Sequence, residues 1–179
     1  MADAATATRS AVLGVHSSAM LETVPPCVRF SLRAPATSVD AVSKALGVTL
    51  PVKPKTSAEK GGVHALWLGP DEWFLIAPAG TDLAGRLAKA DAFHSAVDIS
   101  HRNAAILVRG AGAADILNAG CPQDLSLPAF PVGACSRTVL AKTEVILYRL
   151  AADAFRIEVW RSFAPYAHDF LEDAVRRAV

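Results

Sequence analysis

The feature that most constrains this chain is a series of short alternating segments separated by turns of only a few residues. The clearest case joins residues 63–68 to residues 72–77 through Gly69-Pro70-Asp71. Proline presets the first central position of a turn, and Gly and Asp favour the positions around it. Strands joined so closely must run antiparallel, because a parallel pair needs a long crossover connection. The pattern therefore argues against a doubly wound α/β fold.

The remaining segments extend this pattern into an α+β architecture. Helices with an apolar stripe are predicted near residues 38–46, 81–87, 113–119 and 162–175. The predicted strands lie at residues 27–33, 63–68, 72–77, 96–99, 104–108, 137–141, 144–150 and 155–160. We expect largely antiparallel sheets with helices packed on one face. The short polar turn at residues 100–103 predicts that the strands on either side of it are antiparallel neighbours.

Composition sets the broad class of protein. Hydrophobic residues make up 52% of the chain, and 18 basic against 17 acidic residues give a net charge of +1. This balance is typical of an ordered globular protein and lacks the clustered positive charge of a nucleic-acid binder.

The predicted domain organisation is a flexible arm at residues 1–22 followed by a single α+β domain at residues 23–179. A division of that domain into two lobes, about 23–110 and 111–179, stays open.

The N-terminus and the hydropathy pattern predict a cytoplasmic location. Residues 1–19 carry an early Asp3 and lack a basic start followed by an apolar run, so we expect no signal peptide. No segment approaches the roughly 18 consecutive apolar residues of a membrane helix.

Motifs for common cofactors and nucleophiles are missing from the sequence. It has no G-x-G-x-x-G, no phosphate-binding loop and no G-x-S-x-G, which argues against a flavin or dinucleotide site of the usual kind. Cys27, Cys121 and Cys135 form no C-x-x-C pair, and none of the five histidines pairs at H-x-H or H-x-x-x-H spacing. We therefore predict reduced thiols, no metal site and no catalytic residue.

One polar cluster, at residues 98–102, is a candidate ligand site. Asp98 and Ser100 would share one side of a strand, with His101 and Arg102 following. A buried aspartate beside a histidine could orient a base or hydrogen-bond an amine or a pterin. In the alternative, Asp98 only caps the turn backbone and His101 lies in water. The sequence predicts a ligand contact at these four residues and leaves the alternative open.

The tryptophans and a basic loop are candidates for contact with a partner. Trp160 falls on the polar face of its predicted strand, which indicates either contact with another chain or a second packed layer. We assign it, with Trp67, Trp73 and the adjacent Arg161, to a predicted partner interface, because aromatics and arginines dominate interface energetics. The loop with Lys53, Lys55 and Lys60 either contacts an acidic partner or is simply solvated.

An ordered set of segments resembles the gamma subunits of heterotetrameric sarcosine oxidase. The segments that carry the match are W-L-G-P-D-E-W-F-L at residues 67–75, V-D-I-S-H at 97–101 and G-C-P-Q-D-L at 120–125. They are followed by F-P-V-G at 130–133 and R-S-F-A-P-Y at 161–166. Any one segment is weak, but the order is specific and runs from about Cys27 to the C-terminus.

The resemblance implies a non-catalytic chain that supports an alpha subunit, with beta and delta subunits completing the assembly. Such an assembly oxidises sarcosine to glycine, makes hydrogen peroxide and passes a one-carbon unit to tetrahydrofolate. FAD, FMN, NAD and zinc would be held by the other subunits, and this chain would hold no cofactor. The resemblance also implies the fold of the folate-binding domain of aminomethyltransferases. The alternative is a stand-alone folate-binding or one-carbon-transfer protein acting through Asp98.

Overall fold

A computed structural model describes residues 19–178 of the chain, which form two five-stranded sheets. Every neighbouring pair of strands in them is antiparallel. The β2 sheet has the order β3 (Ser57–Lys60), β4 (Val63–Gly69), β5 (Glu72–Ala77), β2 (Val28–Arg33) and β6 (Ser95–Asp98). The β10 sheet has the order β1 (Met20–Thr23), β7 (Asn103–Arg109), β10 (Ala154–Trp160), β9 (Thr143–Ala151) and β8 (Cys135–Leu140). The predicted α+β class with antiparallel sheets is confirmed.

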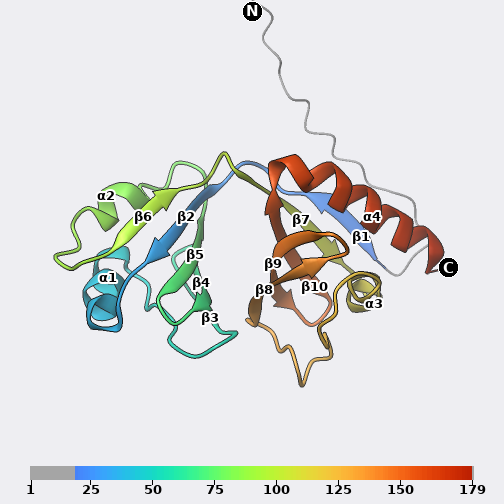
Figure 1. Cartoon of the computed structure of the whole chain (residues 1–179), viewed down its shortest axis with the longest axis horizontal. Coiled ribbons are helices and arrows are strands. Elements are labelled where there is room, and N and C mark those ends of the chain that lie inside the picture. Colours follow the sequence, from blue (N-terminus) through green and yellow to red (C-terminus); the bar gives the residue numbers. More distant parts are fainter. Residues whose placement is uncertain (1–18, 179) are drawn as a thin grey trace, which may run out of the picture.

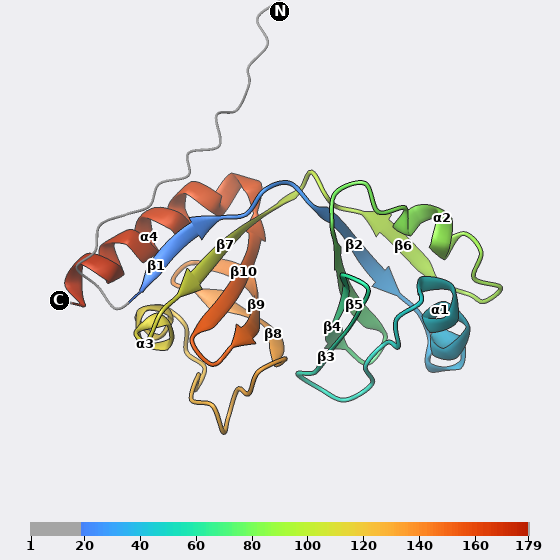
Figure 2. The same ribbon diagram turned by 180° about the vertical axis from the view of Figure 1, so that it is seen from behind.

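The chain crosses between the two sheets twice. Residues 24–27 lead from β1 to β2, and residues 99–102 lead from β6 to β7. Figures 1 and 2 show the sheets side by side beneath these crossings. The prediction that the strands flanking residues 100–103 pair with one another is therefore wrong. The second crossing, near residue 100, places β7 in the β10 sheet, where it pairs with β1 and β10.

Two short strands lie in segments for which the sequence predicted none. β3 falls within the polar loop around the lysines, and β1 includes the end of the predicted arm. The rest of that arm, residues 1–18, lies outside the described residues. Both strands lie at sheet edges, where one neighbour suffices and a strong apolar alternation is not needed.

Helices cover one face of each sheet, as predicted. α1 (Val39–Leu46) and α2 (Leu83–Leu87) pack on the β2 sheet around a core that includes Leu32, Trp73 and Leu75. The 3₁₀ turn Ala36–Ser38 precedes α1, and Gly47, at φ 79°, ends it in the left-handed region that favours glycine.

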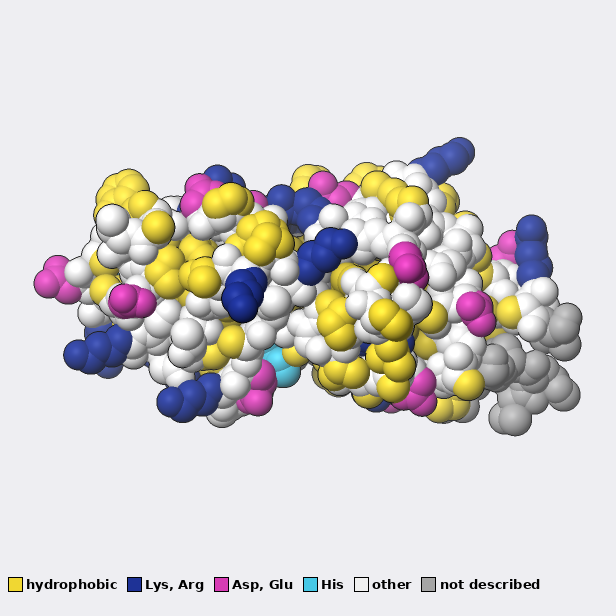
Figure 3. Space-filling view, turned by 90° about the horizontal axis from the view of Figure 1, so that it is seen from below, with side chains coloured by type: hydrophobic (Ala, Val, Ile, Leu, Met, Phe, Trp, Pro, Cys, Tyr) yellow, Lys and Arg dark blue, Asp and Glu magenta, His cyan; other side chains and the backbone are white. Residues whose placement is uncertain are grey.

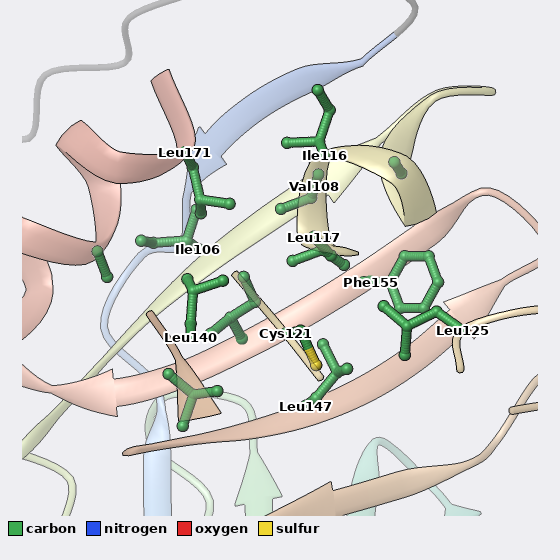
Figure 4. Close-up of a cluster of buried hydrophobic side chains, with 14 of the residues drawn as sticks. Ile106, Val108, Ile116, Leu117, Cys121, Leu125, Leu140, Leu147, Phe155 and Leu171 are labelled. Carbon is green, nitrogen blue, oxygen red and sulfur yellow. The ribbon is translucent and has the colours of Figure 1, made fainter. Parts of the chain in front are cut away.

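On the β10 sheet, α3 (Ala113–Asn118) and α4 (Ala164–Arg177) enclose the second core, shown in Figure 4. Phe155 and Ile157 point into it from β10, and Leu171 from α4. The 3₁₀ turn Arg161–Phe163 precedes α4, so that helix begins two residues after the predicted cap at Ser162. No helix within residues 19–178 combines the length and apolarity needed to span a membrane.

A third apolar cluster joins the faces of the two sheets that carry no helices. Leu66, Phe74 and Ile76 come from the β2 sheet, and Cys135, Ile146 and Tyr148 from the β10 sheet, with Ile99 between them. Alternate residues of β5 therefore face different partners: Trp73 and Leu75 face helices, while Phe74 and Ile76 face the other sheet. This second packed layer determines the environment of every polar residue on the inner faces.

Candidate functional site

A network of buried charges crosses between the two sheets. Arg29 of β2 donates from Nε to Glu158 Oε2 of β10 at 2.6 Å, and Arg156 donates from Nε to Glu158 Oε1 at 2.8 Å. The side chains of Arg29 and Glu158 are 3% and 0% exposed. Both carboxylate oxygens are thus engaged by guanidinium groups, so Glu158 has no free oxygen to serve as a general base. The arrangement holds the sheets together.

Cys27 and His64 border this network. The Arg156 guanidinium lies 3.2 Å from the Cys27 Sγ, and Arg29 donates to the Cys27 carbonyl at 3.3 Å. His64 Nδ1 lies 3.3 Å from the Tyr148 hydroxyl. Burial lowers the pKa of His64, and the nearby Arg156 acts in the same direction while Glu59 opposes it. The lowered pKa favours the neutral form of the ring, which packs edge-on against Tyr148.

Cys135 is a second structural link between the sheets. Its backbone N–H donates to the Lys55 carbonyl at 3.2 Å, and its Sγ lies 3.2 and 3.4 Å from the carbonyl oxygens of Thr56 and Trp67. Burial raises the pKa of the Cys135 thiol to about 12. The thiol therefore stays protonated near neutral pH, which makes it a poor nucleophile there.

The predicted ligand cluster at residues 98–102 is one of the two crossings between the sheets. Asp98 Oδ1 accepts a hydrogen bond from the Ser100 N–H at 2.8 Å, and Ser100 Oγ accepts one from the Arg29 N–H at 2.9 Å. The bonds to Ser100 lower the pKa of Asp98. Asp98 and His101 are exposed, as in the alternative in which Asp98 caps the turn backbone and His101 lies in water. Asp98 caps the turn, and Ser100 ties it to β2.

Arg102, at the end of that crossing, meets two residues of the predicted partner interface. Its guanidinium carbon lies 5.4 Å from the centre of the Trp160 ring, a cation–π arrangement, and its carbonyl accepts the Arg161 N–H at 2.8 Å. The Trp160 and Phe163 rings lie 6.4 Å apart. Tyr166 follows one helical turn after Phe163. We call these five residues, Arg102, Trp160, Arg161, Phe163 and Tyr166, the aromatic–arginine surface.

A polar cleft between the sheets adjoins this surface. It is lined by residues of both sheets, including Glu72, Arg137, Arg102 and Trp160, and its volume is about 40 Å³. Glu72 and Arg137 are joined by a salt bridge of 2.5 Å, and this bond to Glu72 raises the pKa of Arg137. A space of this size admits a few water molecules.

The other two predicted interface tryptophans lie elsewhere. Trp73 is 1% exposed in the core beneath α1 and α2, and its indole N–H donates to the Pro51 carbonyl at 2.7 Å. Its side chain therefore has no surface to offer a partner, and we remove it from the candidate interface. Trp67 is half-buried against the same core. Trp73 is buried because alternate residues of β5 face the helices, and Trp73 shares that side with Leu75.

One group of potential metal ligands lies on the charged side of the last helix, which the sequence indicates to be solvated. His168, Asp169 and Glu172 on α4 place one ligand atom each within 4.8 Å of one another. The spacing of four residues between His168 and Glu172 could have indicated it. Glu172 also accepts a salt bridge from Arg176 at 2.9 Å, and this cation competes with a metal for the same carboxylate.

Comparison with known proteins decides the family. The family model described as "Sarcosine oxidase, gamma subunit family" matches residues 32–177. The chain belongs to the sarcosine oxidase gamma subunit family. It is 34% identical over 138 residues to the sarcosine oxidase subunit gamma of Corynebacterium sp. (strain P-1), covering 75% of this chain and 68% of the relative. The corresponding Arthrobacter sp. protein is 33% identical over 138 residues, with the same coverage.

Solved structures agree with this family. A chain of the heterotetrameric sarcosine oxidase from Corynebacterium sp. U-96, solved with pyrrole 2-carboxylate, superposes with a TM-score of 0.88 at 30% identity, covering 97% of this chain and 92% of that one. The glycine cleavage system aminomethyltransferase T from Bartonella henselae gives a TM-score of 0.66 at 19% identity, covering 87% of this chain and 45% of that one. The second likeness shows the shared fold only.

The segments that resemble this gamma subunit family are spread over both sheets and the connections between their elements. Residues 67–75 form the hairpin of β4 and β5, and residues 161–166 form the 3₁₀ turn and the start of α4. Sequence reasoning missed the Arg29–Glu158–Arg156 network, although alternation placed Arg156 and Glu158 on one face. The alternation left two readings of that face, contact with another chain or a second packed layer, because the packing of the second sheet against it is not visible in a local pattern.

Proposed function

We propose that this chain is the gamma subunit of a heterotetrameric sarcosine oxidase and serves there as a non-catalytic structural subunit. The observation that carries the proposal is the superposition on a chain of such an enzyme over nearly the full length of both chains. A likeness of this extent at 30% identity leaves little room for an added or lost catalytic lobe within the matched part.

The chemistry of the described residues supports a non-catalytic role. The buried charged side chains Arg29, Glu158 and Arg149 are bonded to other groups of the same chain. No buried side-chain nitrogen or oxygen among residues 19–178 lacks a hydrogen-bond partner. Unpaired, perturbed groups in a cleft are the usual mark of a catalytic site. Here the buried charged groups are paired, either with one another or with backbone carbonyls.

The proposed assembly supplies the chemistry through its other chains. Alpha, beta and delta subunits would carry FAD, FMN, NAD and zinc, oxidise sarcosine to glycine in the cytoplasm, and release hydrogen peroxide. Tetrahydrofolate would accept the one-carbon unit on another subunit. A one-carbon role for this chain through Asp98 has less support, because Asp98 is exposed and bonded to its own turn.

The test is co-expression of this chain with the three other subunits. We expect one complex by size-exclusion chromatography with light scattering, and sarcosine-dependent hydrogen peroxide release by that complex. The chain purified alone should be colourless and should show no quenching of its tryptophan fluorescence by tetrahydrofolate. A chain that elutes apart from the other three subunits contradicts the proposal, as does saturable folate binding by the chain alone.

A further inference from the structure

The aromatic–arginine surface exposes an unusual amount of aromatic side chain in one place. Trp160, Phe163 and Tyr166 are 47%, 47% and 40% exposed. They succeed one another at intervals of three residues from the end of β10 into α4. Tryptophan, tyrosine and arginine are the residue types most enriched among those that dominate protein–protein binding energy. Their grouping distinguishes this area from single exposed apolar residues, which are normal on any surface.

The two arginines of this surface have no acidic partner among the described residues. Arg102 donates from Nε to the Asn103 side chain at 3.3 Å and lies over Trp160, and Arg161 forms no salt bridge within residues 19–178. Apart from Arg86, which bonds the Leu46 carbonyl and also lacks a salt bridge, the other exposed arginines among residues 19–178 are compensated. Salt bridges join Arg33 to Asp71, Arg109 to Glu22, Arg137 to Glu72, Arg176 to Glu172, and Arg177 to Asp173.

The backbone beneath these side chains is held in place. Trp160 pairs with Asn103 in the ladder of β10 and β7, and the Arg161 N–H donates to the Arg102 carbonyl at 2.8 Å. Pro165 lies in the first turn of α4, where its fixed φ favours the helix. The surface is therefore formed before any partner arrives, which lowers the entropic cost of binding.

We propose that the aromatic–arginine surface docks this chain onto a larger subunit, against an apolar patch of that subunit that carries at least one carboxylate. The carboxylate would pair with Arg102 or Arg161, and the apolar patch would cover Trp160, Phe163 and Tyr166. The uncompensated positive charge and the exposed aromatic rings together favour this occupant. This inference rests on the proposed function, because it names the surface through which the assembly holds this chain.

A competing apolar area has a weaker claim. The loop between α3 and β8 exposes Leu127 and Val132, at 47% and 55%, and runs along the lower edge of the molecule in Figure 1. Figure 3, seen from below, shows hydrophobic side chains gathered in two areas with Lys or Arg side chains between them. The residues of that loop are aliphatic, and they lack the combination of aromatic rings with arginines.

Three variants test the inference in the four-subunit system. Trp160→Ala and Arg102→Glu each remove part of the surface, and Phe93→Ala is the matched control, since Phe93 is 84% exposed in the loop between α2 and β6. We expect Trp160→Ala to weaken binding to the remaining subunits about 30-fold, which corresponds to a strong interface residue. Arg102→Glu should weaken it at least as much, and Phe93→Ala less than about 2-fold. Thermal unfolding of all three should match the unaltered chain.

The outcomes separate this inference from the proposed function. If the unaltered chain assembles and both surface variants bind as it does, the docking surface is overturned and the gamma-subunit assignment stands. If the unaltered chain does not assemble, the proposed function itself fails. Concentration-dependent dimers of the isolated chain that Trp160→Ala abolishes would assign the surface to a second copy and overturn the inference. Weaker salt dependence of binding in Arg102→Ala than in the unaltered chain would support the predicted carboxylate.

Discussion

Two arginine–aromatic pairs in this protein lie in opposite environments. Arg149 lies over Phe155 at 4.6 Å inside the β10 sheet, and its guanidinium bonds the carbonyls of Leu125 and Phe130 at 2.8 and 2.7 Å. It also bonds the Ala152 carbonyl. Arg102 lies over Trp160 at 5.4 Å on the surface, with one hydrogen bond to Asn103. The guanidinium group of Arg149 is bonded within the chain, whereas that of Arg102 remains available to another molecule.

This difference separates residues that maintain the fold from those that remain free for a partner. Burial forces a charged group to find partners within its own chain, as Arg29 and Glu158 do across the sheets. When an exposed arginine lacks such partners, its charge and the aromatic ring beside it both remain available to bind another molecule. Variants of the interior should therefore change stability, and variants of the surface should change assembly.

The largest effect is expected at Glu158. Glu158→Ala leaves Arg29 and Arg156 buried without their carboxylate, which should lower the free energy of unfolding by about 3–5 kcal/mol. Urea denaturation followed by circular dichroism measures it. The control is Glu22→Ala, which breaks the exposed pair with Arg109 and should cost no more than about 1 kcal/mol. Equal losses of unfolding free energy in the two variants would contradict the distinction between the buried and the exposed ion pairs.

The next effect is expected at Arg149. Arg149→Met removes the donors that satisfy the Leu125 and Phe130 carbonyls, so we predict a loss of about 3 kcal/mol. Hydrogen exchange should show faster exchange in residues 121–134. Arg177→Met is the control, because Arg177 is 79% exposed in its pair with Asp173, and its effect should stay within about 0.5 kcal/mol. An Arg149 variant as stable as the control would contradict the account.

A smaller effect is expected from pH through His64. Its folded-state pKa is lowered mainly by burial, so the unfolded state binds the proton more readily. Stability should therefore fall as the pH drops from about 7 through the unfolded-state pKa of about 6.5. His64→Gln should flatten this part of the stability curve, measured by urea denaturation at pH 5 to 8. An unchanged slope in the variant would assign the pH dependence to other groups.

The smallest effect is expected at Asp98. Asp98 and Asp124 both accept the N–H of the residue two positions later, at 2.8 Å in each case. Asp98→Ala and Asp124→Ala should each lower stability only slightly, and by the same amount, because both carboxylates are exposed, and both should leave partner affinity and sarcosine turnover unchanged. If Asp98→Ala alone reduced turnover with tetrahydrofolate, the turn would have a ligand role that its matched counterpart lacks.

Local sequence signals predicted local structure well. Gly69-Pro70-Asp71 predicted the hairpin of β4 and β5, and the apolar stripe predicted α4, because turns and amphipathic helices depend on residues close in sequence. The polar turn at residues 100–103 led, for the same reason, to the wrong prediction that the strands on either side of it pair. Its length fits a hairpin, but the chain crosses to another sheet there, and only contacts distant in sequence decide between the two.

The face of β10 shows what else the sequence could not decide. Alternation placed Arg156, Glu158 and Trp160 on one side and left two readings, a second packed layer or contact with another chain. The structure places Glu158 under the β2 sheet, while Trp160, at the strand end, stays 47% exposed. How far the β2 sheet extends over β10 decides which of these residues are buried, and no local sequence pattern shows that extent.

Oxidative footprinting of the aromatic side chains, in the free chain and in the four-subunit complex, tests the central claim most directly. The account predicts that Trp160, Phe163 and Tyr166 react in the free chain and are strongly protected in the complex, while Phe93 stays reactive in both. Unchanged reactivity of Trp160, Phe163 and Tyr166 in an active complex would contradict it, because the surface left open by the fold would then remain uncovered.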